Sequence, residues 1–261
     1  MAERGGALIT GAARRIGRCI AETLADAGWH VVVHYNQSSA EAEATVAAVR
    51  AAGGQADAIA ANLSDPASCS GLIDASGQAT GGLTCLVNNA SLFVEDTAHD
   101  VDAAIFDQVM AVNLRAPAIL ARAFADQVPA DGQGVIVNIL DQKLANPNPD
   151  FLSYTLSKHG LAALTEMAAS VYGPTVRVCG VAPGLTLPSG DQPHAQFEAV
   201  HGRTPLKQGS RPEDIAGAVL YLADARAVTG ETILVDGGQH LVPSARDVMF
   251  LDPDPSEESD K

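Results

Sequence analysis

A tyrosine and a lysine one helical turn apart, Tyr154 and Lys158, are side chains in this sequence that could transfer a proton. The apolar residues after them, Leu161, Leu164 and Met167, have helical spacing, which places both side chains on one face. A free tyrosine keeps its proton up to about pH 10, whereas an ammonium within about 4 to 6 Å lowers the tyrosine pKa. The spacing therefore predicts a tyrosine that exchanges protons near neutral pH. The same pattern also suits a core tyrosine beside a solvated lysine.

The element that must position this pair begins with an apolar, β-branched run, Val135 to Leu140, which is typical of a buried parallel strand. Asp141 follows directly, and a polar loop then leads into the predicted helix. Parallel strands place their ligand crevice at their carboxyl ends. We therefore expect the strand, loop and helix to form one edge of a binding site.

A second candidate site lies near the amino terminus, where the apolar run Ala7 to Thr10 is followed by a turn between Gly11 and Gly17. A helical pattern follows and closes at Gly28. A strand, a tight glycine turn and a helix together point backbone N–H groups and the positive helix end at a phosphate. The pattern predicts a nucleotide site, although such turns also occur without a ligand.

The residues after the next predicted strand, Trp29 to His34, indicate which nucleotide would bind at this site. NAD-binding folds place an acid after this strand to hold the ribose 2′-hydroxyl, and this chain has no acid there. Arg14 and Arg15 in the turn add positive charge, so the balance favours NADPH over NADH. Both arginines could instead be solvated residues at a helix start. Hydrogen-bond donors follow the strand at Asn36, Ser38 and Ser39.

Strand and helix patterns alternate along the rest of the chain. Further strands are predicted at 56–61, 83–87, 177–182 and 232–236, and helices at 41–50, 65–78, 106–124, 152–171 and 212–222. This alternation predicts an α/β fold, a single-domain doubly wound parallel sheet of Rossmann type with about seven strands and helices on both faces.

The composition excludes several classes of partner. A formal charge of −15 makes nucleic acid and anionic membrane surfaces unfavourable partners, because phosphate binding needs clustered Lys and Arg. The four cysteines are widely spaced, so neither a metal site nor a disulfide framework is expected. The amino terminus has no apolar signal core, and the sequence has no run of about 18 apolar residues that could span a bilayer. We therefore expect a cytoplasmic protein.

The chain is predicted to divide into one reductase domain, residues 1–250, and an acidic, disordered tail at 251–261. Within the domain, residues 186–208 are rich in proline and glycine, which fits a mobile substrate loop over a crevice. An ordinary surface loop is the alternative.

These motifs in this order resemble the short-chain dehydrogenase/reductase family over about residues 5–242. The resemblance is carried by Thr10-Gly11 through Gly17, Asn88-Asn89-Ala90, Asn113, Tyr154-x-x-x-Lys158, Pro183-Gly184 and Val235-Asp-Gly-Gly238.

Within that family the chain is most similar to the pteridine reductases. Four features carry this closer resemblance: Thr-Gly-Ala-Ala-Arg-Arg-Ile-Gly with Arg15 at the usual middle glycine, His34-Tyr-Asn-Gln-Ser-Ser-Ala-Glu-Ala, Asn-Asn-Ala-Ser91-Leu-Phe93, and Asp141 in place of the usual serine, thirteen positions before Tyr154.

The resemblance implies a catalytic set in which Tyr154 donates a proton, Lys158 lowers its pKa and holds the nicotinamide ribose, Asp141 assists, and Asn113 orders a relay water. A satisfied core asparagine is the alternative for Asn113. The implied NADPH-binding residues are Gly11, Arg14, Arg15, Ile16, His34, Tyr35, Asn36, Ser38, Ser39, Asn62, Leu63, Asn89, Ala90, Ser91, Tyr154, Lys158, Pro183, Gly184 and Leu185. The implied substrate residues are Arg15, Ser91, Phe93, Asp141, Tyr154 and Leu185, with Phe93 stacking a pterin. A homotetramer is also implied.

Two departures from the family pattern concern the cofactor rather than catalysis. Asn62 stands where relatives usually have an aspartate, and Asn36-Gln37 replaces the His-Arg pair of the pteridine reductases. A carboxylate at Asp141 would repel a developing oxyanion unless it is protonated, whereas a pterin imine nitrogen needs a proton after hydride addition. We therefore expect reduction of a C=N bond in a dihydropterin or dihydrofolate-type substrate. The alternatives are an NADPH-dependent reductase of 3-oxoacyl groups or ketones, and a binding protein that senses NADPH without turnover.

Overall fold

The computed structural model describes residues 4–188, 197 and 201–250. Within these residues seven parallel strands form one sheet in the order β3-β2-β1-β4-β5-β6-β7. The strands are β1 (Gly6–Ile9), β2 (His30–Tyr35), β3 (Gln55–Ala60), β4 (Leu83–Asn88), β5 (Gly134–Ile139), β6 (Val176–Pro183) and β7 (Thr232–Val235).

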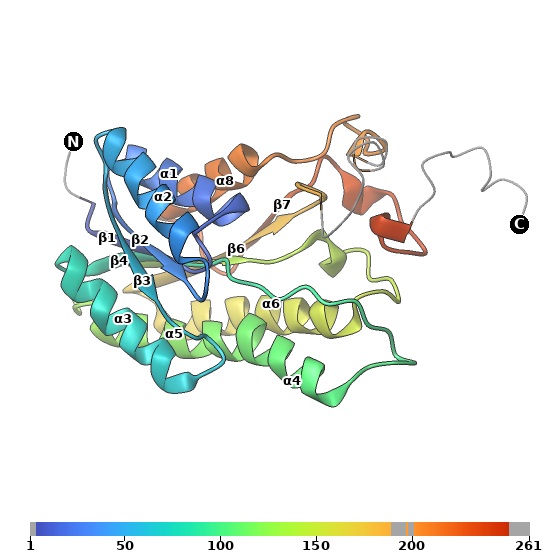
Figure 1. The fold of residues 1–261 in the computed structure, drawn as a ribbon, viewed down its shortest axis with the longest axis horizontal. Helices are drawn as coiled ribbons and strands as arrows, with labels where there is room; N and C mark the ends of the chain where they lie inside the picture. Colours follow the sequence, from blue (N-terminus) through green and yellow to red (C-terminus); the bar gives the residue numbers. More distant parts are fainter. Residues whose placement is uncertain (1–3, 189–196, 198–200, 251–261) are drawn as a thin grey trace, which may run out of the picture.

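Helices cover both faces of this sheet, as Figure 1 shows. One face carries α1 (Arg15–Asp26), α2 (Ser39–Ala51) and α8 (Pro212–Asp224). The other carries α3 (Pro66–Thr80), α4 (Ala103–Met110), the π-helical η1 (Ala111–Arg115), α5 (Ala116–Gln127) and α6 (Leu152–Tyr172). Three short 3₁₀ helices complete the described elements: η2 (Gln142–Leu144), η3 (Gln239–Leu241) and η4 (Val248–Phe250). The predicted doubly wound α/β fold is confirmed.

The order of the strands explains where a ligand can bind. The chain runs outward from β1 to β2 and β3, then returns to add β4 on the other side of β1. Connections therefore leave β1 and β4 in opposite directions, which opens a crevice at the carboxyl ends of these strands.

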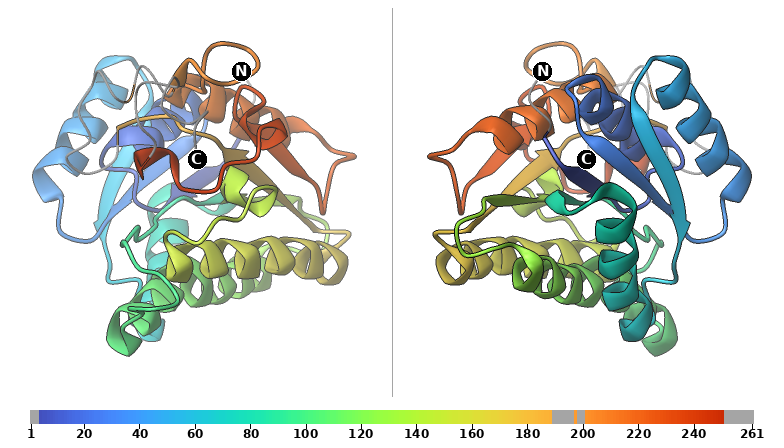
Figure 2. Two further views of the ribbon diagram at one scale, coloured as in Figure 1. Left: turned by 90° about the vertical axis from the view of Figure 1, so that its right-hand side faces the viewer. Right: turned by 90° about the vertical axis from the view of Figure 1, so that its left-hand side faces the viewer.

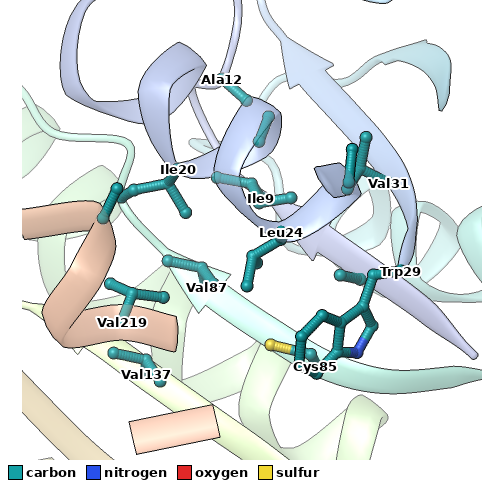
Figure 3. Packing of buried hydrophobic residues seen from close by; sticks show 14 of the residues in the cluster. Ile9, Ala12, Ile20, Leu24, Trp29, Val31, Cys85, Val87, Val137 and Val219 are labelled. Carbon is teal, nitrogen blue, oxygen red and sulfur yellow. The ribbon is translucent and has the colours of Figure 1, made fainter. Parts of the chain in front are cut away.

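Alternate residues of the central strands fill two hydrophobic cores, one on each face of the sheet. Ile9, Val87 and Val137 point toward α1 and α8, where they pack with Leu24 and Val219 (Figure 3). The residues one position earlier belong to the second core, with Phe124 of α5; they are Leu8, Leu86 and Ile136. All of these side chains are fully buried. Each contributes about 1.5 to 3 kcal/mol, so the cores hold the strand ends rigidly below the crevice.

The helix predicted at 106–124 as continuous is interrupted in the structure. It begins at Ala103, passes through the π-helical turn η1 and continues to Gln127. Pro117 explains the interruption, since it has no N–H for the carbonyl of Asn113 and its ring crowds that carbonyl. By length and composition this stretch could also cross a bilayer. It lies in the helical layer of Figure 1, with Leu120 and Phe124 in the core.

The predicted substrate loop, 186–208, lies partly outside the described residues. The described parts are 186–188, 197 and 201–208. The predicted disordered tail, 251–261, lies wholly outside them.

Candidate active site

A cleft of about 660 Å³ opens at the carboxyl ends of β1, β2, β4, β5 and β6. It brings together most of the residues implied by the resemblance: Gly11, Arg14, Arg15, Ile16, His34, Tyr35, Asn36, Ser38, Asn62, Leu63, Asn89, Ala90, Ser91, Phe93, Asp141, Tyr154, Lys158, Pro183, Gly184 and Leu185. Ser39, the first residue of α2, and Asn113, in η1, do not line it.

The centre of the cleft is a hydrogen-bonded pair of acids. Asp141 follows β5, and its Oδ2 accepts a hydrogen bond from the Tyr154 hydroxyl at 2.7 Å. Its Oδ1 accepts from the Lys143 N–H at 2.8 Å, which caps η2. Burial raises the pKa of Asp141 above its ordinary value, against the opposing effect of these hydrogen bonds. A proton can therefore pass between Tyr154 and Asp141 along this hydrogen bond.

The expectation that Tyr154 has a lowered pKa is wrong for this structure. Burial, followed by the charge and hydrogen bond of Asp141, raises the pKa of Tyr154 well above its ordinary value. The Lys158 ammonium lies 5.4 Å from the tyrosine ring centroid, and its Nζ donates to the Ile139 carbonyl at 2.8 Å. Burial lowers the pKa of Lys158 to about 8. Tyr154 thus holds its proton firmly until an acceptor approaches.

Asn113 holds the chain that follows β4. Its Oδ1 accepts from the Leu92 N–H at 2.8 Å, and its Nδ2 donates to the Leu92 carbonyl at 2.9 Å and to Ser157 Oγ at 3.1 Å. The side chain is 1% exposed. It therefore fixes the segment between Ser91 and Phe93, and its predicted part in ordering a relay water stays a prediction.

Phe93 offers a flat apolar surface next to the acid pair. Its ring stacks on Phe151 with centroids 4.0 Å apart, and it meets Tyr154 edge-on at 4.7 Å. Phe93 remains 40% exposed and lines the cleft. A planar ligand could stack on the exposed part of this ring.

The glycine turn after β1 is packed against the end of β4. Gly11 has φ +64, and a Cβ there would lie 3.0 Å from the Ala90 Cα. A Cβ at Gly17 would lie 2.5 Å from both Asn89 Nδ2 and the Gly11 carbonyl oxygen. Both positions therefore require glycine. Asn89 and Ala90 also donate their backbone N–H groups to Thr10 Oγ1, which locks the turn.

The start of α1 leaves donors available to an anion. Arg14 is its N-cap, and among the described residues its side chain caps no N–H of the first turn. Arg15 has φ 56, a left-handed conformation that favours glycine, and its Nη2 donates to the Pro188 carbonyl at 2.9 Å. The positive helix end and two guanidinium groups thus meet at one side of the cleft.

His34 joins this turn to β3. Its Nδ1 accepts from the Gly11 N–H at 3.0 Å, so the ring is neutral, and its Nε2 donates to the Ala61 carbonyl at 3.1 Å. Only 2% of the residue is exposed. Burial lowers the pKa of His34 to about 4.

We expect the free energy of unfolding to depend on pH through His34. Its folded pKa lies below the value of about 6.5 expected when unfolded, so this contribution is complete above about pH 6.5 and is lost as pH falls toward about 4. The loss between pH 7 and pH 5 is about 2 kcal/mol. Urea unfolding at both pH values should show this loss in the wild type and a smaller one in His34→Gln. Equal losses in the two proteins would contradict the assignment.

Several lining residues escaped the sequence analysis. Gln142 is buried next to Asp141, and among the described contacts its Oε1 accepts no hydrogen bond. Gln239 Oε1 accepts from the Leu185 N–H at 2.9 Å. Lys143, Asp247, Val248 and Met249 also line the cleft. Three of these residues directly follow recognised motifs, a position that could have marked them as lining the cleft: Gln142, Lys143 and Gln239. Residues 247–249 lie beyond the last motif and had no such signal.

Comparisons with known proteins agree with this geometry. The family model described as enoyl-(acyl carrier protein) reductase matches residues 11–240. The chain is 40% identical to FolM alternative dihydrofolate reductase 1 from Brucella canis, solved in complex with NADP, with a TM-score of 0.88 over 93% of this chain and 96% of that one. It is 32% identical to pteridine reductase 1 of Leishmania tarentolae, over 90% of this chain and 96% of the relative. It is 34% identical to the granaticin polyketide synthase putative ketoacyl reductase 2 of Streptomyces violaceoruber, again over 90% and 96%.

Proposed function

This chain belongs to the short-chain dehydrogenase/reductase family of oxidoreductases, and we propose that it is an NADPH-dependent pteridine reductase. Its substrate would be a dihydropterin or a dihydrofolate-type compound, reduced at a C=N bond. Similarity to a dihydrofolate reductase solved with NADP and to a pteridine reductase supports this proposal.

The observation that carries the proposal is the hydrogen bond between Tyr154 and Asp141. A carboxylate in this position disfavours negative charge on a neighbouring oxygen, as would develop during reduction of a carbonyl. It does not oppose a nitrogen that gains a proton. Because burial raises the pKa of Asp141, its protonated form persists to higher pH than in an exposed aspartate, and that form can deliver a proton through Tyr154.

The donors of the cleft fit a dinucleotide cofactor. The first turn of α1 offers backbone N–H groups to a phosphate, beside Arg14 and Arg15. Asn36 and Ser38 would meet the adenosine ribose and its 2′-phosphate, and the Lys158 ammonium would meet the nicotinamide ribose. Bound NADPH supplies the hydride.

The residues of this chain supply the proton and hold the substrate. Phe93 would stack the flat ring, and Tyr154 would donate its hydroxyl proton to the substrate nitrogen. The Tyr154 oxygen would then regain a proton from the protonated form of Asp141, along the line of their 2.7 Å hydrogen bond, and the Asp141 carboxylate would take up a proton from solvent. Lys158, whose pKa is about 8, carries a positive charge near neutral pH that stabilises the anionic form of the pair.

We expect NADPH to bind more tightly than NADH by about ten- to a hundredfold, since one charge-assisted contact contributes about 1.5 to 3 kcal/mol. The residues after β2, Tyr35-Asn36-Gln37, include no acid that would repel a 2′-phosphate. Calorimetric titration of each cofactor measures the ratio, and Arg14→Ala should reduce it. Equal affinities in the wild type would count against this cofactor assignment.

The proposed function is tested by supplying NADPH with 7,8-dihydrobiopterin, 7,8-dihydrofolate, a 3-oxoacyl thioester and a set of ketones. We expect oxidation of NADPH with the first two compounds. A carbonyl reductase is the second candidate, because the chain is 34% identical to a putative ketoacyl reductase. Turnover confined to the carbonyl compounds would replace the pteridine assignment with this second one.

We also propose that residues 1–250 act as one reductase domain that assembles as a homotetramer in the cytoplasm. Leu156, Met167 and Val171 support assembly, since these apolar side chains of α6 are 45%, 68% and 74% exposed. The four cysteines, all free thiols, suit a reducing compartment. A monomer mass in light scattering at micromolar concentration would exclude the tetramer.

A further inference from the structure

The last described segment of the chain, Arg246–Phe250, forms part of the wall of the cleft; we call it the C-terminal strap. Figure 2 shows this segment, in red, passing beside the short helix η2 that follows β5. Asp247, Val248 and Met249 line the same cleft as Tyr154. The strap thus lines the same cleft as Tyr154 although it comes from a distant part of the sequence: Arg246 is 96 residues from Asp150, which accepts its hydrogen bond.

Two ion pairs hold the strap to the loop between β5 and α6. The Asp150 carboxylate accepts two hydrogen bonds from Arg246 Nε, at 3.0 and 2.9 Å, and one from the Asp247 N–H at 2.7 Å. Lys143 Nζ lies 2.8 Å from Asp247 Oδ2. Asp150, Lys143 and Asp247 are 3%, 2% and 6% exposed. Removing Arg246 or Lys143 takes the ion-pair partner away from a buried carboxylate, Asp150 or Asp247, so these ion pairs fix the position of the strap.

A column of aromatic rings connects the strap to the proposed substrate surface. The Arg246 guanidinium lies 4.9 Å from the Phe250 ring centroid. Phe250 stacks on Phe151 with centroids 5.8 Å apart and an interplanar angle of 16°. Phe151 stacks in turn on Phe93 at 4.0 Å. Phe151 is 2% exposed and has φ 58 at the start of α6, so packing holds its ring in place.

We propose that Arg246, Asp150 and Phe250 are positioning residues. They fix the position of the Phe93 ring so that a flat heteroaromatic substrate can stack on it next to Tyr154. They act through Phe151, while Asp247 to Met249 complete the wall of the cleft. This inference rests on the proposed function, since it takes Phe93 as the surface on which the substrate stacks. It adds a specificity-determining element that follows the final strand of the fold.

The variants Arg246→Ala, Asp150→Asn and Phe250→Leu test the inference in the full-length protein. We expect each to raise the KM for 7,8-dihydrobiopterin by about tenfold and to leave kcat within about twofold, because binding of the ring is weakened rather than the proton transfer. NADPH affinity should not change. Arg246→Lys should recover most of the wild-type KM, since lysine restores the charge beside Asp150.

Arg50→Ala is the matched control. Arg50 pairs with Asp57 at 2.9 Å and is 58% exposed, close to the 53% of Arg246, but it lies at the end of α2 outside the cleft. Its KM should equal that of the wild type. Because Arg246 is half exposed, its replacement leaves no core cavity, and thermal melting of each variant shows whether it is folded.

An unchanged KM in folded Arg246→Ala and Phe250→Leu proteins would overturn the inference, even if their melting temperature fell. A drop in kcat without a change in KM would overturn it as well. If the wild type reduces a 3-oxoacyl thioester and no pterin, the proposed function fails separately. The same variants are then compared on the thioester. An unchanged KM for the thioester would show that the strap has no role in substrate binding.

Discussion

Tyr154→Phe is expected to lower kcat by about 10² to 10⁴, the usual contribution of general acid catalysis. Phenylalanine preserves the ring and its edge-on contact with Phe93 at 4.7 Å. It removes the hydroxyl that bonds to Asp141 at 2.7 Å. The lost interaction is therefore proton transfer, and the NADPH dissociation constant should stay nearly unchanged.

Steady-state turnover and cofactor titration on the same preparation measure both parts of this prediction. Tyr172→Phe is the control, since it makes the same substitution at the far end of α6. Undiminished turnover in Tyr154→Phe would mean that the proton comes from another group. The catalytic assignment would then be wrong.

Asp141→Ser is expected to slow reduction of a pterin by about 10², because a serine hydroxyl is too weak an acid to return a proton to the Tyr154 oxygen. Burial raises the pKa of Asp141, so the wild-type group retains its proton to higher pH than an exposed aspartate. Asp141→Asn should have a similar effect on turnover, since it keeps the size of the side chain without its ionisable proton. Reduction rates at saturating NADPH measure both variants.

The same substitution discriminates between the two substrate classes. For a carbonyl substrate, Asp141→Ser would replace a carboxylate with a neutral donor to the developing oxyanion, so activity would be unchanged or higher. Faster pterin reduction by Asp141→Ser would contradict the role of the aspartate as the group that returns a proton to Tyr154.

The sheet could be predicted because its residues obey local rules. Val135 to Leu140 is apolar and β-branched, and β5 spans Gly134–Ile139, buried throughout. The turn between Gly11 and Gly17 needs glycine at both ends, as the packing against Ala90 and Asn89 shows. The run of Val135 to Leu140 and the spacing of the two glycines are visible directly in the sequence, although the packing that requires the glycines is not.

The direction of the Tyr154 pKa shift could not be obtained in this way. Spacing along a helix identifies Lys158 as a neighbour, but it does not reveal how deeply the tyrosine is buried. Nor does it show that Asp141, which follows β5, accepts its hydrogen bond. Burial and the aspartate together raise the pKa of Tyr154.

The C-terminal strap was missed for a related reason. Arg246 to Phe250 has no helical or strand periodicity, and its partner Asp150 is 96 residues from Arg246. Pairing across that distance depends on the completed fold. The interruption at η1 had a local signal in Pro117, which a stricter use of the helix pattern would have recognised.

The most direct test of the central claim follows a hydride from the cofactor to the substrate. Wild-type protein is incubated with 7,8-dihydrobiopterin and NADPH deuterated at both positions of nicotinamide C4, and the pterin product is analysed by mass spectrometry. We predict a tetrahydropterin that carries a single deuterium on carbon, formed by the wild type and formed about 10² to 10⁴ times more slowly by Tyr154→Phe. A pterin that stays unreduced, or a reduced pterin without deuterium, would contradict the proposal that this protein is a pteridine reductase.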